Sequence, residues 1–82
     1  MIHKINYEED NIIEFPIRKK PTGFIINFYG CSMIRPIDFF NLIFFIKRYS
    51  KIGFHFMNVK GVIRNQLSLL GKRFGNIRVD KI

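Results

Sequence analysis

Two apolar stretches, GFIINFYG at residues 23–30 and GFHFMNV at residues 53–59, decide the fold of this chain. Both are short runs of aromatic and β-branched residues beside glycine, a pattern typical of a strand that is buried on both faces. Each run is followed by a longer segment with helical spacing of its apolar residues. Strands that alternate with helices in this way predict a sheet of parallel strands joined by right-handed crossovers.

The helix after the first stretch is expected at Pro36–Ser50. Proline suits the first helical position because it has no N–H to leave unpaired, and Asp38 complements the helix dipole. Three basic residues near the C-terminal end are favoured by the same dipole, and Gly53 marks the stop. One narrow polar face comprises Asp38, Asn41, Phe45 and Arg48. The helix is therefore either deeply packed or has an apolar side left for a partner.

A second helix is expected at Val62–Leu70, followed by an edge strand at residues 77–82. Residues 2–7 and 12–17 indicate a β-hairpin, with Pro16 at an edge because proline cannot donate to a strand ladder. The sequence thus predicts an α/β fold with a mixed, mostly parallel sheet. Residues 1–22, the hairpin and a basic loop, and residues 23–82, a βαβαβ core, form one domain because 82 residues are too few for two cores.

The charge of the chain is confined to its second half. Residues 1–41 carry equal numbers of basic and acidic groups, whereas residues 42–82 carry nine basic groups against Asp80 alone, so the formal net charge of +8 arises there. An electrostatic field this one-sided indicates which kinds of partner the chain can bind, but it does not indicate the fold. It fits a solvated basic face, a nucleic-acid surface or an acidic protein partner.

Residue types exclude several kinds of site. A lone cysteine, Cys31, cannot form an internal disulfide, and two distant histidines make a structural zinc site improbable. The longest apolar stretch, residues 39–46, is less than half of the roughly 20 residues that a membrane span needs. With no visible signal peptide, the chain is expected to be cytoplasmic.

The sequence predicts no enzyme, cofactor or metal. Cys31 and Ser32 lie between a predicted strand and helix, but no general base is expected within reach of either side chain. His55 lies between Phe54 and Phe56, so packing is its expected role. Ser32 stays a candidate phospho-acceptor, because a helix N-terminus favours a phosphate.

The order of these segments resembles the STAS family (sulphate-transporter and anti-sigma-factor-antagonist domains), including its small stand-alone and divergent STAS-like members. The family places a strand, a loop, a helix that begins near a phospho-acceptor serine, a second strand, and a helix that ends in leucines and glycine. The matching pieces here are residues 24–29, 30–35, 36–50, 54–59 and 62–71, the last ending in LSLLG. Arg35-Pro36-Ile37-Asp38 stands where the family has an Asp-Ser pair. The resemblance implies a non-catalytic regulatory domain that binds another protein.

That domain is expected to dock its partner through the loop at residues 31–35 and the exposed side of the first helix. The candidate contacts are Ser32, Ile34, Arg35, Asp38, Asn41 and Phe45. Arg35 and the basic second helix favour an acidic partner through charge complementarity. A homodimer is a further expectation, since edge strands and a Phe-rich helix are poorly hidden in so small a domain.

The alternative is a basic nucleic-acid-binding α/β domain that contacts phosphates mainly through its C-terminal half. The candidate phosphate contacts are Arg18, Lys19, Lys20, Lys60, Arg64, Lys72, Arg73 and Arg78. None of the common nucleic-acid-binding motifs is present in the sequence. The alternative therefore depends on these charges and on Phe74, between Arg73 and Gly75, as a residue that could stack a base.

Overall fold

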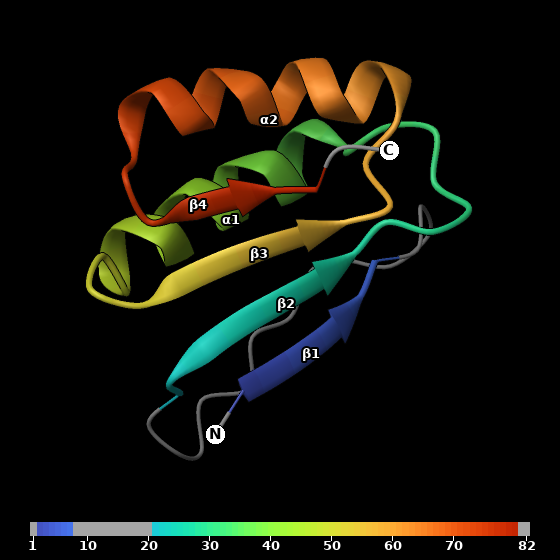
Figure 1. Cartoon of the computed structure of the whole chain (residues 1–82). Helices are drawn as coiled ribbons and strands as arrows, with labels where there is room; N and C mark the ends of the chain where they lie inside the picture. The colour runs from blue at the N-terminus through green and yellow to red at the C-terminus, as the bar shows by residue number, and fades with distance from the viewer. Residues whose placement is uncertain (1, 8–20, 81–82) are drawn as a thin grey trace.

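The computed structural model describes residues 2–7 and 21–80. In chain order, its elements are strands β1 (Ile2–Asn6) and β2 (Gly23–Asn27), helix α1 (Pro36–Arg48), strand β3 (Gly53–Met57), helix α2 (Gly61–Arg73) and strand β4 (Ile77–Val79). The four described strands form one sheet, and α1 lies behind it in Figure 1. The protein has an α/β fold, and from β2 onward the predicted βαβαβ order is confirmed.

All four described strands run parallel and lie side by side in chain order. In the middle of the sheet, Gly23 of β2 pairs with Gly53 of β3, and Ile26 pairs with Phe56. The prediction that these two segments are parallel neighbours is therefore confirmed. The predicted edge strand near the C-terminus is also present, as the short β4.

The prediction of a mixed sheet is wrong for the described strands, because β1 pairs in parallel with β2, with Ile2 opposite Gly23. Parallel neighbours need a crossover of a dozen or more residues and cannot be joined by a tight turn. Residues 7–22 supply that length. The second strand of the expected hairpin, residues 12–17, lies outside the described residues.

Both helices pack on the same face of the sheet. Right-handed crossovers that always step to the next strand in the same direction must pass over one side. The core forms between that side and the helices, and its buried members include Phe24, Ile26, Phe28, Phe54, Phe56, Leu42, Ile46, Ile63, Leu67 and Leu70. Within it, the rings of Phe24 and Phe54 stack with their centroids 4.7 Å apart.

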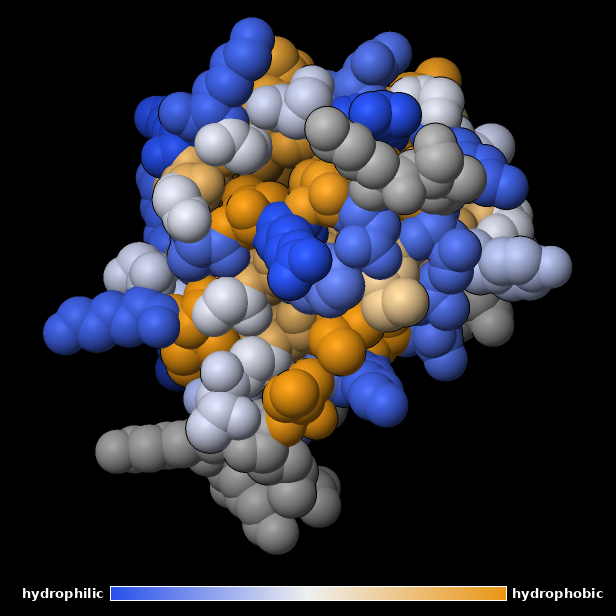
Figure 2. All heavy atoms as spheres, viewed as in Figure 1, coloured by the Kyte–Doolittle hydropathy of each residue, from blue (hydrophilic) through white to orange (hydrophobic). Residues whose placement is uncertain are grey.

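The opposite side of the sheet, here called the open sheet face, carries the alternate residues of the strands. Ile25, His55 and Met57 are only partly buried there, and Arg78 is exposed. Figure 2 shows apolar side chains in the middle of the visible surface, with hydrophilic ones between and around them. The prediction that β2 and β3 are buried on both faces is wrong, because the strand order sends both described helices to the other side.

Candidate functional site

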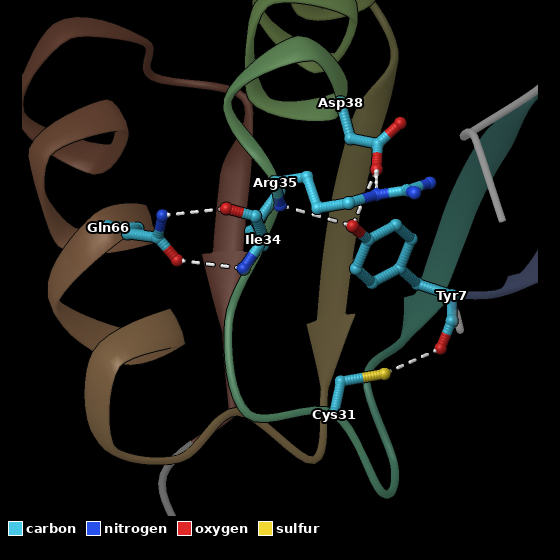
Figure 3. Close-up of polar contacts among 6 residues, drawn as sticks. All are labelled: Tyr7, Cys31, Ile34, Arg35, Asp38 and Gln66. Carbon is cyan, nitrogen blue, oxygen red and sulfur yellow. Dashed lines mark hydrogen bonds and ion pairs between the residues drawn. The ribbon is translucent and has the colours of Figure 1, made fainter. Parts of the chain in front are cut away.

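A buried polar cluster fixes the start of α1 against the end of β1. The Tyr7 hydroxyl donates a hydrogen bond of 2.6 Å to Asp38 Oδ2, and Arg35 Nε reaches the same oxygen at 3.0 Å (Figure 3). The backbone N–H of Arg35 donates to the Tyr7 oxygen at 3.2 Å. Asp38 is completely buried. A buried carboxylate requires such partners, so its role is to position the helix.

The electrostatics of this cluster keep both of its donors protonated. Burial raises the pKa of Tyr7 above its ordinary value, and the hydrogen bond to Asp38 raises it further, against a lowering by the backbone N–H of Arg35. The hydrogen bond to Asp38 also raises the pKa of the Arg35 guanidinium. The phenol and the guanidinium therefore stay donors to one carboxylate over the whole physiological pH range.

The loop between β2 and α1 is held from two sides. Cys31 Sγ donates to the Tyr7 carbonyl at 2.8 Å, which ties the loop to the end of β1. On the other side, the Gln66 amide of α2 accepts from the Ile34 N–H at 3.1 Å and donates to the Ile34 carbonyl at 3.0 Å (Figure 3). Gly30, with φ of +78°, allows the sharp turn that begins the loop. The start of α1 is thus pre-organised.

The outer side of α1 carries an uncovered apolar stripe. Ile37, Phe40 and Phe44 are 58%, 64% and 69% exposed, respectively, and their spacing of three and four residues aligns them along one side of the helix. Met33, in the preceding loop, is also exposed. We call Ile37, Phe40 and Phe44 the α1 stripe. Large contiguous apolar side chains on a small domain mark an interaction surface.

The charges around the α1 stripe are positive. Lys47 and Arg48 occupy the last turn of α1, and Lys51 follows them; all three are exposed. The described residues hold only two acidic side chains, the buried Asp38 and Asp80 on the open sheet face. No exposed carboxylate among the described residues accompanies the stripe.

The structure separates the six predicted partner contacts into different environments. Ser32 is exposed, whereas Arg35, Asn41 and Phe45 are partly buried. Ile34 and Asp38 are fully buried, so the expectation that they lie on an exposed docking side is wrong. Asp38 faces inward because Tyr7 and Arg35 satisfy its carboxylate, and with Leu42 and Ile46 it forms the buried side of the helix.

The outer face of α1 therefore carries other residues than its polar spacing predicts. Polarity does not identify the outward side of this helix, because it has more large apolar residues than one inner face accepts. The spacing of Asp38, Leu42 and Ile46, four residues apart, was the available signal for the buried side. The residues that were missed are those of the α1 stripe.

The predicted phosphate contacts do not form one patch. Lys60, Arg64, Lys72 and Arg73 are exposed on or beside α2, in the helical layer. Arg78 lies on the open sheet face instead, opposite His55 in the strand register. Arg18, Lys19 and Lys20 lie outside the described residues.

His55 has polar neighbours that the sequence did not reveal. Its Nε2 lies 2.6 Å from Asp80 Oδ1, and Arg78 is its partner in β4. The expectation of an entirely apolar surrounding is wrong, because the alternation of β3 turns His55 to the open sheet face. Its flanking residues Phe54 and Phe56 point into the core.

Among the described residues, no group of three metal-ligating side chains comes together. Nor does any helix in residues 2–7 and 21–80 combine the length and apolarity of a bilayer crossing. Comparisons with protein-family models, curated proteins and solved structures find no match to this chain. The surfaces of the chain itself are therefore the basis for inferring its function.

Proposed function

We propose that this chain is a small regulatory docking domain of STAS-like type, which captures an acidic amphipathic helix of a partner protein on the α1 stripe. The observation that carries the proposal is the exposure of Ile37, Phe40 and Phe44, each more than half accessible on one helix face. The order of elements from β2 to β4, which is that of the STAS resemblance, supports the family part of the proposal.

An apolar stripe at helical spacing suits a second amphipathic helix, whose apolar face would cover it. The basic residues Lys47, Arg48 and Lys51 lie at one end of the stripe and select acidic side chains on that helix. Charge complementarity of this kind sets partner choice and encounter rate more than affinity. The exposed Phe40 and Phe44 rings would become buried on binding and supply most of the binding free energy.

A second copy of this chain fits the stripe less well than an acidic partner. Antiparallel pairing of two α1 helices sets the cations at the end of one copy beside Arg35 and the positive helix terminus of the other. Parallel pairing sets the two groups of cations side by side. Both arrangements bring like charges together, which costs free energy at an interface.

Capture experiments with matched variants test this proposal. Phe40→Glu with Phe44→Glu adds charge to the stripe without touching the core, and Leu69→Glu, at a 65% exposed residue of α2, is the control. We expect the double variant to lose its partner, and the control to retain it, with unchanged circular dichroism for both. Phe45 is unsuitable as a test because it packs against the core.

Equal capture by the double variant and the unaltered chain would refute the docking surface. Sedimentation of the purified chain supplies the second measurement. A dimer that the double variant abolishes would assign the stripe to self-association and contradict the charge argument above.

A further inference from the structure

The open sheet face contains a hollow of about 450 Å³ across the amino ends of the strands. Its floor includes Gly23 of β2 and Gly53 of β3, with Ile2 of β1 at one end and Gly75 near the other. Ile25, His55 and Arg78 also line it. The hollow is thus a groove that crosses the sheet, with small residues below and larger ones alongside.

The glycines of the floor are not required by the backbone. A Cβ built on Gly53 or Gly75 meets no atom within 4 Å, and one on Gly23 makes only ordinary contacts, the nearest at 3.7 Å to Ile2. Neither Gly23 nor Gly53 has a positive φ. Gly23 and Gly53 are the first residues of β2 and β3, and a glycine in a strand can mark the close approach of a ligand or of another backbone. The pairing of Gly23 with Gly53 leaves such an approach open on two adjacent strands.

One row of side chains across the sheet supplies three lining residues of the groove, Ile25, His55 and Arg78, and continues to Lys4 of β1. The register sets Lys4 beside Ile25, Ile25 beside His55 and His55 beside Arg78. Asp80 Oδ1 lies 2.6 Å from His55 Nε2 and holds the imidazole in place. Imidazole rings and guanidinium planes both stack on nucleobases. The cations Lys4 and Arg78 lie at opposite ends of the row, about 14 Å apart at the usual strand spacing.

The floor is held in shape by the neighbouring loop. The Asn76 side-chain amide donates to the Ile52 carbonyl at 2.9 Å and to the Tyr49 carbonyl at 3.3 Å. These bonds join the loop before β4 to the loop before β3, so Gly75 and Gly53 keep their relative positions. A groove that exists before binding loses less conformational entropy when a ligand enters.

We propose that the open sheet face binds single-stranded nucleic acid, with one base in the groove over Gly23 and Gly53 and its neighbours stacked on His55 and Arg78. Lys4 and Arg78 meet phosphates on either side of the base. Single-strand binding commonly combines a basic groove with such stacking surfaces. Asp80, the described carboxylate on this face, would repel a phosphate, but its charge is paired with His55.

Charge selects this occupant over a second copy of the chain. Packing two open sheet faces together would set Lys4 and Arg78 against the same cations, while the described carboxylate on this face, Asp80, is already paired. The formal net charge of +8 also favours binding of a polyanion over self-association. The proposal is independent of docking on the α1 stripe, which lies on the other side of the molecule.

Fluorescence anisotropy with a labelled 12-nucleotide single-stranded RNA and its DNA counterpart tests the proposal. We expect binding to weaken roughly tenfold between about 50 and 200 mM salt, as a few phosphate contacts dictate. Gly53→Val fills the groove and should reduce the affinity for the oligonucleotide on the order of tenfold, because a base can no longer enter the groove. Thermal unfolding checks that this variant folds, with Gly53→Ala as the milder replacement.

Two matched variants test the role of charge. Arg78→Ala removes an exposed cation from the open sheet face, and Arg73→Ala removes one from α2. Only Arg78→Ala should lower affinity strongly and reduce the salt dependence by about one phosphate contact. The Phe40→Glu and Phe44→Glu double variant should still bind, which separates this proposal from the docking function.

Several results would overturn the proposal. These are no binding at low salt, unchanged affinity of Gly53→Val, and equal losses in the two arginine variants, which would mean diffuse attraction only. Competition by a free mononucleotide as effective as by the oligonucleotide would make the groove a small-molecule site. A dimer in sedimentation that Gly53→Val abolishes would make the face a self-contact.

Discussion

The two faces of the sheet are built from alternate residues of the same strands, yet they differ completely in environment. Phe24, Ile26, Phe54 and Phe56 point to the helices and are at most 4% exposed. Ile25 and His55, their immediate neighbours, point the other way and are only half-buried. The difference follows from strand order, because chain-order pairing with right-handed crossovers brings every described helix to one side. Apolar composition of a strand therefore does not imply that both of its faces are covered.

The largest expected effect separates the two faces in β3. Phe56→Ala should reduce the free energy of unfolding by about 3–5 kcal/mol, because it leaves a cavity in the core. Met57→Ala, one residue further on the open sheet face, should cost about 1 kcal/mol or less. Urea denaturation of both variants measures the difference. Similar losses would mean that the open sheet face is packed as tightly as the core.

A smaller contrast is expected at the end of β1. Tyr7→Phe removes the hydroxyl that donates to the Asp38 carboxylate and should cost about 1.5–3 kcal/mol. Its neighbour Asn6 points to the open face, where its amide oxygen accepts from Asn27 at 3.3 Å, so Asn6→Ala should change stability by about 0.5 kcal/mol or less. Urea denaturation again provides the comparison, and a neutral Tyr7→Phe would show that the buried cluster does not stabilise the helix start.

The smallest expected effect is a dependence on alkaline pH. Because the folded-state pKa of Tyr7 is raised above its ordinary value of 10.0, the folded state holds the phenolic proton more tightly than the unfolded chain. The resulting stability is fully present below pH 10 and is lost as the pH rises through the folded-state pKa. Thermal unfolding between pH 8 and 11 should show a steeper decline for the unaltered chain than for Tyr7→Phe. Parallel curves would contradict this assignment.

Much of the architecture was predictable from local signals. Glycine-bounded apolar runs identified β2 and β3, Pro36 marked the first residue of α1, and alternation identified β4. These features depend on residues close together in the sequence, which is why they could be read directly. Boundaries were less exact: α2 runs through Gly71 to Arg73, since a glycine inside a helix costs stability without ending it.

The features that were not predictable depend on contacts between distant segments. Asp38 faces inward because Tyr7, 31 residues earlier, donates to its carboxylate. The parallel pairing of β1 depends on which strand Ile2 reaches, and the alternation of residues 2–7 fits either direction. The exposure of Phe40 and Phe44 follows from which side of α1 meets the sheet, and the many apolar residues of that helix allow more than one answer.

The pairing of each strand with its sequence neighbour has a consequence for folding kinetics. Each described strand forms hydrogen bonds only with the described strands that precede or follow it in the chain. The sequence separation of paired strands is therefore similar across the sheet, and no central strand needs a partner from a distant part of the sequence. The β2–α1–β3 unit can act as a nucleus because it contains the stacked Phe24 and Phe54 rings, with β4 and β1 added at its two edges. Slowing of refolding by Phe54→Leu, against faster unfolding alone for a variant in β1, would be the kinetic signature of that sequence of events.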